Sequence, residues 1–164
     1  MRRILISLTF ALLLAGCDQP AEEQTASIGL GFYQRESPLS VTETMDRLEQ
    51  AVRERGFRVF NRIDHAAGAA SVDMELRPTQ LLIFGNPQGG TPLMRNAQTI
   101  AIDLPLKALI YEGADGAVKI AFNHPAFLAA RHDLANGEQV TARMTGLLDG
   151  LADAAAGEGD NSLQ

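Results

Sequence analysis

The sequence predicts an α+β fold: a single sheet of about five strands with two long helices packed on it, in the order strand, helix, four strands and helix. Two amphipathic stretches, over residues 40–56 and 136–151, predict the helices, and apolar or alternating stretches between them predict most of the strands. The chain of 164 residues is 46% hydrophobic and 21% charged, a composition typical of one globular domain and not of a disordered protein.

The amino terminus resembles the signal of a bacterial lipoprotein. Two arginines are followed by an apolar stretch over residues 4–14, which is too short for an ordinary transmembrane helix. The next residues, Leu14-Ala15-Gly16-Cys17, are similar to the lipobox, in which small residues fit the signal peptidase and the cysteine thiol accepts the lipid. We expect residues 1–16 to form the signal peptide, and residues 17–27 to contain the lipidated Cys17 and a flexible polar tether.

This signal predicts a location on the periplasmic side of the bacterial cell envelope, with the membrane as a partner through the lipid. Asp18 follows the cysteine, and such an aspartate is associated with retention at the inner membrane in enterobacterial lipoproteins. Cys17 is the only cysteine, which excludes an intramolecular disulfide. The net charge of −6 argues against nucleic acid as a partner, because phosphate binding requires clustered lysines and arginines.

The folded domain is expected over residues 28–156, and the polar tail over residues 157–164 is expected to be disordered. A first strand is predicted over residues 28–35, where apolar residues alternate with small or polar neighbours. We therefore expect the chain to enter the sheet directly after the tether.

The first long helix has clear signals at both of its ends. Ser40 and Glu43 form a capping box, in which each side chain accepts a hydrogen bond from the backbone of the other residue. Apolar residues follow at helical spacing, and Gly56 supplies the stop. A strand is predicted over residues 57–63, with Asn61 interrupting its alternation.

The segment after this strand has two interpretations. Asp64 is expected to cap a short helix from about residue 65 to residue 72, which a run of alanines favours. The alternative is a strand, because Val72, Met74 and Leu76 alternate with acidic residues.

Residues 81–84 are continuously apolar and predict a central strand. A glycine-rich loop is expected over residues 85–90, followed by a short helix with Thr91 as its N-cap and Pro92 as its first residue. The exposed N–H groups of such a loop could contact an anion, and a purely structural turn is the alternative.

The carboxyl-terminal part predicts two further strands, over residues 104–111 and 117–122, and a short helix over residues 125–131. Asn136 is expected to cap the last long helix. Two glycines of that helix, Gly146 and Gly150, each cost about 1 kcal/mol relative to alanine. They favour a close approach of a strand or of a partner helix, and plain tolerance is the alternative.

Several motifs resemble one known family, the domains of unknown function 302 (DUF302), over about residues 39–134. The resemblance implies a fold of strand, helix, four strands and helix, similar to the TATA-binding-protein-like class. It implies no activity, and DNA binding is not transferred, because a shared fold is not a shared function. The motifs are Ile63-Asp64-His65-Ala66-Ala67, Leu82-Ile83-Phe84-Gly85-Asn86-Pro87, Gly90-Thr91-Pro92-Leu93-Met94, Asp103-Leu104-Pro105-Leu106-Lys107 and Arg131-His132.

The polar residues of these motifs form the candidate ligand-binding site. We expect them to converge on one side of the sheet and to bind a small ligand or a protein partner of the cell envelope. Arg131 could pair with an acid such as Asp103 or hold a ligand carboxylate. The sequence has no nucleophile motif, which favours a non-enzymatic role. The six candidates are Asp64, His65, Asn86, Asp103, Arg131 and His132.

Two other functions remain open. The first is a metal-binding protein or an enzyme that uses His65 and His132, with Asp64 or Asp133 as a further ligand. No pair of histidines has a recognised metal-binding spacing, so no metal or other cofactor is predicted. The second is a structural homodimer, formed through the glycine-bearing face of the last helix or through an edge strand.

Overall fold

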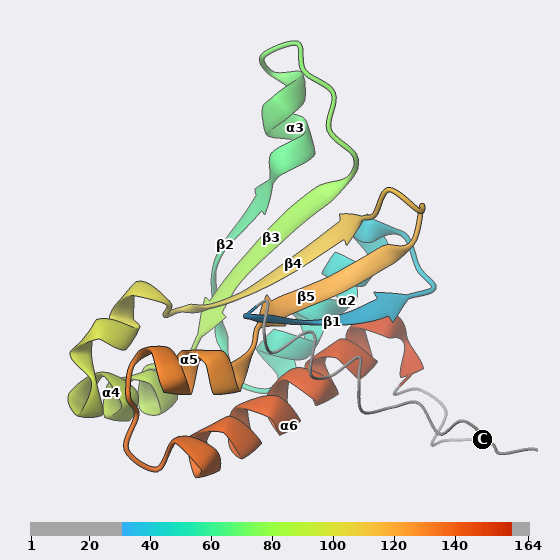
Figure 1. The fold of residues 1–164 in the computed structure, drawn as a ribbon. Helices are drawn as coiled ribbons and strands as arrows, with labels where there is room; N and C mark the ends of the chain where they lie inside the picture. The colour runs from blue at the N-terminus through green and yellow to red at the C-terminus, as the bar shows by residue number, and fades with distance from the viewer. Residues whose placement is uncertain (1–30, 159–164) are drawn as a thin grey trace, which may run out of the picture.

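The computed structural model describes residues 31–158, which form the α+β domain in Figure 1. The predicted signal peptide over residues 1–16 and the lipidated Cys17 with its tether lie outside the described residues, as does Asp18. The beginning of the predicted first strand and residues 159–164 of the predicted tail lie outside them as well.

The observed order of elements agrees with the predicted one, and the fold class is confirmed. All five strands are antiparallel to their neighbours, and the order in the sheet is β1-β5-β4-β3-β2. The elements are β1 (Phe32–Ser37), α2 (Val41–Glu54), β2 (Arg58–Asp64), α3 (His65–Ala70), β3 (Thr79–Gly85), α4 (Pro87–Asn96), η1 (Gln98–Ile102), β4 (Leu106–Glu112), β5 (Val118–Asn123), α5 (Pro125–Arg131) and α6 (Gly137–Ala156).

The first helix, α2, forms as its sequence predicts. The Ser40 hydroxyl accepts a hydrogen bond from the Glu43 N–H, and the Glu43 carboxylate accepts one from the Ser40 N–H at 3.1 Å. Gly56 has a φ of +75°, the left-handed conformation that ends the helix. The buried stripe of α2 faces the sheet and α6.

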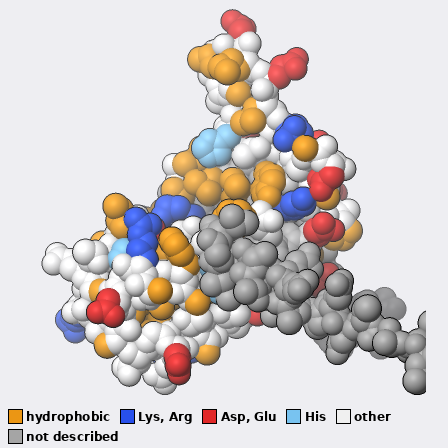
Figure 2. All heavy atoms as spheres, in the orientation of Figure 1, with side chains coloured by type: hydrophobic (Ala, Val, Ile, Leu, Met, Phe, Trp, Pro, Cys, Tyr) orange, Lys and Arg blue, Asp and Glu red, His pale blue; other side chains and the backbone are white. Residues whose placement is uncertain are grey.

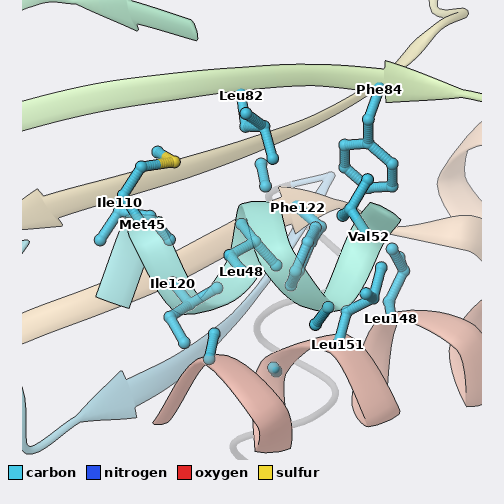
Figure 3. Close-up of a cluster of buried hydrophobic side chains, with 14 of the residues drawn as sticks. Met45, Leu48, Val52, Leu82, Phe84, Ile110, Ile120, Phe122, Leu148 and Leu151 are labelled. Carbon is cyan, nitrogen blue, oxygen red and sulfur yellow. The ribbon is translucent and has the colours of Figure 1, made fainter. Parts of the chain in front are cut away.

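One face of the sheet packs against α2 and α6 and forms the main hydrophobic core (Figures 1 and 3). The strands alternate, so that every second side chain enters this core. A smaller second core of Ile100, Leu134 and Val140 joins η1 to the last two helices. The largest buried side chains of the main core are Met45, Leu48, Val52, Leu82, Phe84, Ile110, Ile120, Leu148 and Leu151.

Tyr33 joins the edge strand β1 to α6. Its hydroxyl donates a hydrogen bond to the Asp149 carboxylate, and its ring stacks on Phe122 with the ring centroids 6.0 Å apart. Burial first, and then the Asp149 carboxylate, raise the pKa of Tyr33 to about 12, although Arg35 opposes them in part.

We expect the domain to lose stability as the pH rises from about 10 to about 12. The unfolded chain releases the phenolic proton near its usual pKa of about 10, whereas the folded chain retains it, so this stabilisation is complete only below pH 10 or so. Tyr33→Phe should remove that part of the pH dependence, measured by urea unfolding at about pH 9 and about pH 11. Tyr111→Phe is the matched control, and an alkaline loss unchanged by Tyr33→Phe would contradict the assignment.

The sequence interruption in β2 corresponds to a β-bulge. The pairing of β2 with β3 shifts register between Val59 and Asn61, which leaves Phe60 as the extra residue. The Phe60 side chain is therefore turned away from the main core and is 47% exposed. Its ring lies under the Arg58 guanidinium, 5.1 Å from the ring centroid.

The prediction of a loop over residues 85–90 is wrong, because most of this segment belongs to helix α4. Asn86 is the N-cap, and its side chain accepts a hydrogen bond from the Gln88 N–H at 2.9 Å. Pro87 occupies the first turn, where a missing N–H costs nothing. Thr91 and Pro92, predicted to begin the helix, lie inside it.

The β2–β3 hairpin extends beyond the rest of the sheet and carries α3 at its tip (Figure 1). Asp64 caps α3, as predicted, by accepting a hydrogen bond from the Ala67 N–H at 2.9 Å. The helix ends at Ala70 and buries no residue. The alternative strand does not form, and the side chains of Val72, Met74 and Leu76 are 64%, 65% and 50% exposed. We call residues 65–78 the arm.

The last helix, α6, differs from its prediction at two places. Asn136 precedes it in a left-handed conformation, and its side chain makes no capping hydrogen bond. The expected close approach at the glycines is also wrong within the described domain. A Cβ on Gly146 would have nothing within 4 Å, and one on Gly150 would meet only the Arg55 guanidinium, at 3.6 Å.

Gly146→Ala is therefore expected to raise the free energy of unfolding by about 1 kcal/mol, because alanine lowers the entropic cost of the helix and the added methyl group has room. Chemical denaturation of the two proteins measures the change. An unchanged or lower free energy of unfolding would contradict the assignment of Gly146 to an open, exposed position of α6.

The sheet face opposite α2 and α6 carries no helix in the described part of the chain (Figure 1). Apolar side chains gather over β3 and β4 on this face in Figure 2. Leu81, Leu109 and Tyr111 line a shallow hollow of about 310 Å³ there. We call this surface the open sheet face.

Candidate functional site

The six predicted site residues fall into two groups at opposite ends of β3. Asp64 pairs with Gln80 near the start of β3, whereas Asn86 follows Gly85 at its end. The five residue steps between Gln80 and Gly85 span about 17 Å. The prediction that all six residues converge on one side of the sheet is therefore wrong.

Asp64 and His65 form the group at the base of the arm. The second carboxylate oxygen of Asp64 accepts a hydrogen bond from the Gln80 amide at 3.3 Å, and Gln80 in turn accepts from Arg62. The side chain of His65 is exposed. Since His132 belongs to the other group, the two histidines cannot share one metal ion.

Asp103, Arg131 and His132 come together between η1 and α5. The His132 ring is almost fully buried, with its Nε2 atom 2.6 Å from one oxygen of the Asp103 carboxylate. The other ring nitrogen, Nδ1, lies 3.0 Å from the Thr99 hydroxyl. The Arg131 guanidinium donates to the second carboxylate oxygen at 3.3 Å. We call these four residues the Asp103 cluster.

The Asp103 cluster connects two elements that are distant in sequence. Lys107 holds the local segment that carries Asp103, because its ammonium donates to the carbonyl oxygens of Asp103 and Pro105 at 3.0 and 3.2 Å. No buried side-chain nitrogen or oxygen atom of the described residues lacks a partner. Every partner of the buried His132 imidazole is thus a protein group. Of the two partners predicted for Arg131, an acid such as Asp103 or a ligand carboxylate, the structure shows Asp103.

The cluster offers no metal site formed by the described residues. No group of three or more histidine, cysteine, aspartate or glutamate residues within residues 31–158 could hold a metal ion. The exposed Thr99 hydroxyl lies beside His132, and the cleft described below includes neither residue. The arrangement is that of a connection between η1 and α5.

A cleft with a volume of about 480 Å³ lies beside this connection. One wall is α4, a second is the segment from Leu104 to Leu106, and the third is the side of α6 that carries Val140, Met144 and Leu147. Asn86, alone among the six candidates, lines it. We call it the α4–α6 cleft, and its lining residues are Phe57, Phe60, Gly85–Met94, Ala101, Leu104–Leu106, Val140, Arg143, Met144 and Leu147.

The walls of the cleft are mostly apolar, and Met94 and Met144 supply flexible side chains that can adapt to a ligand. Arg143 is the only ionisable residue in the lining. Sequence reasoning missed this cleft, because the apolar stripe of α6 predicted only contacts with the core. The signal that could have found it is α4 itself, where Asn86 and Pro87 are a typical helix start.

Two comparisons place this domain among known proteins. Residues 33–151, nearly the whole described domain, match the family model of the domain of unknown function DUF302. The chain belongs to the DUF302 family. The crystal structure of an uncharacterized conserved DUF302 protein from Bacillus stearothermophilus has a similar fold, with a TM-score of 0.69 at 20% identity. That likeness covers 77% of this DUF302 chain and 98% of the other, and it concerns the fold alone.

The curated relatives of this DUF302 chain are longer proteins. It is 45% identical over 116 residues to fluoride-specific ion channel FluC 1 of Brucella suis biovar 1 (strain 1330). The aligned residues make up 71% of this chain and 46% of the relative. The identity is also 45% over 116 residues to FluC 1 of Brucella abortus biovar 1 (strain 9-941), of which 43% is covered. The chain thus spans less than half the length of these relatives. No helix within residues 31–158 is long and apolar enough to cross a membrane.

Proposed function

We propose that this DUF302 domain binds a small, largely apolar molecule in the α4–α6 cleft. The observation that carries the proposal is the cleft itself, whose volume of about 480 Å³ lies within the range of about 300–1,000 Å³ typical of small-molecule sites. Apolar walls with a few polar groups, here Asn86, Thr91 and Arg143, are also typical of such sites.

The cleft lies between the α4–η1 segment and helix α6, and this position supports the proposed function. The α4–η1 segment is held to the last two helices by the Asp103 cluster and by the second core, not by the main core. Its distance from α6 can therefore change without opening the main core. A ligand in the cleft would contact both sides and stabilise their arrangement.

A neutral fluorescent dye, N-phenyl-1-naphthylamine, tests the proposal on the full chain synthesised without lipid in a cell-free system. Gly90→Leu extends a side chain toward Leu104 and Met94, because a Cβ at Gly90 would lie 3.6 and 4.0 Å from their side chains. We expect this change to lower the affinity for the dye at least tenfold or so, measured by fluorescence titration.

Gly146→Leu is the matched control, because Gly146 lies on the exposed side of α6 and outside the cleft lining. It should leave dye binding unchanged. Equal affinity of both variants and the original protein would place the dye elsewhere, and no binding by the original protein would reject the proposal.

We also propose that lipid on Cys17 holds this domain at the periplasmic side of the cell envelope, at the inner membrane if Asp18 acts as a retention signal. The lipobox-like Leu14-Ala15-Gly16-Cys17 supports the proposal. Further support comes from the curated relatives, which carry the name of ion channels and hence of membrane proteins. Metabolic labelling with an alkyne fatty acid should mark the original protein and not Cys17→Ser. Equal labelling of both would reject the proposal.

A homodimer is a second candidate, favoured by the exposed apolar residues of the arm. Antiparallel pairing of two arms about Leu76 would set Glu75 of one copy against Arg77 of the other, which provides charge complementarity. Native mass spectrometry should then detect a dimer whose fraction grows with concentration and falls in Leu76→Glu. A monomer at all concentrations would reject this candidate.

A further inference from the structure

We infer that the molecule bound in the α4–α6 cleft carries an anionic group at one end of an apolar body, and that Arg143 binds this group. The inference rests on the proposed function and specifies its ligand class. A free single-chain or small aromatic acid satisfies it, because the volume of about 480 Å³ suits one small molecule.

The charge of the lining supports an anion. Arg143 is the only ionisable side chain among the residues that form the cleft, in a chain whose net charge is −6. An apolar cleft with one positive group favours a ligand with one negative group, since a neutral ligand leaves that group unused.

Arg143 differs from four arginines of the domain in having no carboxylate partner within residues 31–158. Arg35, Arg53, Arg62 and Arg131 each lie within 4.0 Å of a carboxylate. Arg143 makes no such pair with a described residue and no hydrogen bond to one, although its guanidinium has five N–H donors. A planar guanidinium can bind a carboxylate or sulfonate through two of them.

The position of Arg143 on α6 allows this contact. Val140, Met144 and Leu147 line the same wall, at spacings of three to four residues, so Arg143 lies on the cleft side of the helix. The residue is exposed. Its aliphatic part can lie along the apolar wall while the guanidinium remains near the opening. The ligand would then insert its apolar body and leave its anionic end at the mouth.

Two dyes that share one aromatic skeleton test the inference. N-Phenyl-1-naphthylamine is neutral, and 1-anilinonaphthalene-8-sulfonate adds one sulfonate to the same rings. In fluorescence titrations of the full, non-lipidated chain, Arg143→Gln should weaken binding of the sulfonate about tenfold and change binding of the neutral dye less than about twofold. Arg143→Lys should restore part of the sulfonate affinity, and unlabelled decanoate should displace the sulfonate dye from the original protein.

Arg95→Gln is the control, because Arg95 is an exposed arginine of α4 that does not line the cleft. It should leave both affinities unchanged. Arg143→Gln could lower the affinity for both dyes equally, or for neither dye. Either result would reject an anionic end on the ligand but not the proposal that the cleft binds an apolar molecule. If neither dye binds the original protein, the proposed function itself fails. Sedimentation with phosphatidylglycerol vesicles that depends on Arg143, without selective dye binding, would assign Arg143 to a membrane surface and overturn the inference.

Discussion

Phe84→Ala is expected to lower the free energy of unfolding by about 3–5 kcal/mol, the loss typical of a large aromatic residue removed from a core. Phe84 is fully buried between the sheet and the two long helices (Figure 3). Its ring also makes an edge-to-face contact with Phe57, with the centroids 6.1 Å apart. The variant loses this contact and leaves a cavity that the rigid sheet cannot close. Guanidinium unfolding followed by circular dichroism measures the change.

Phe60→Ala is the matched control, because it removes the same side chain from the neighbouring strand at a position that is 47% exposed. The bulge excludes Phe60 from the main core, so its loss should cost less than half as much. Equal losses for the two variants would contradict the assignment of Phe84 to the core and of Phe60 to the cleft side of the sheet.

The second large effect is expected for His132→Ala, with a loss of about 3 kcal/mol. This change removes the closest partner of the Asp103 carboxylate, whose side chain is only 12% exposed, and leaves a largely buried charge with a single longer contact to Arg131. It also deletes the partner of the Thr99 hydroxyl. Urea unfolding of both proteins at one fixed neutral pH measures the loss.

Arg131→Ala gives the matched comparison, since Arg131 contacts the same carboxylate with a side chain that is 47% exposed. Pairs of this kind contribute about 1 kcal/mol or less. His132→Ala should therefore cost clearly more than Arg131→Ala. The reverse order would show that the solvent-facing pair, and not the buried imidazole, connects η1 to α5.

Local signals in the sequence were sufficient for the elements with standard ends. The capping box at Ser40 and Glu43 defines α2, and Asp64 defines the start of α3, because both depend on residues within one turn. The fold class follows from the order of such elements. The first strand was predicted over residues 28–35, whereas β1 ends two residues later, at Ser37. Its limits depend on pairing with β5, which no local pattern encodes.

Helix α4 shows where local signals conflict. Two glycines and an internal proline disfavour a helix, and they led to a predicted loop. Asn86 and Pro87 nevertheless satisfy the first turn, and Leu93 and Met94 pack against the second core. Tertiary contacts thus decide an element whose intrinsic preference is weak.

The candidate site was predicted in part because motif residues are recognisable while their distances are not. Asp103, Arg131 and His132 do meet, as charged and polar groups near the ends of neighbouring elements often do. Asp64 and His65 lie elsewhere because an antiparallel pairing of β2 with β3 sets them at the opposite end of the strand. The cleft escaped prediction since its walls come from three separate segments.

The sheet order has a consequence for how the chain folds during synthesis. β1 is made first, yet its partner β5 is the last strand of the sheet, with Phe32 opposite Asn123. The β2–β3 and β4–β5 hairpins can form as soon as they emerge, whereas β1 must wait until all the other strands have been made. Such distant pairing slows folding. We therefore expect nascent chains truncated before residue 118 to leave β1 unprotected against proteases.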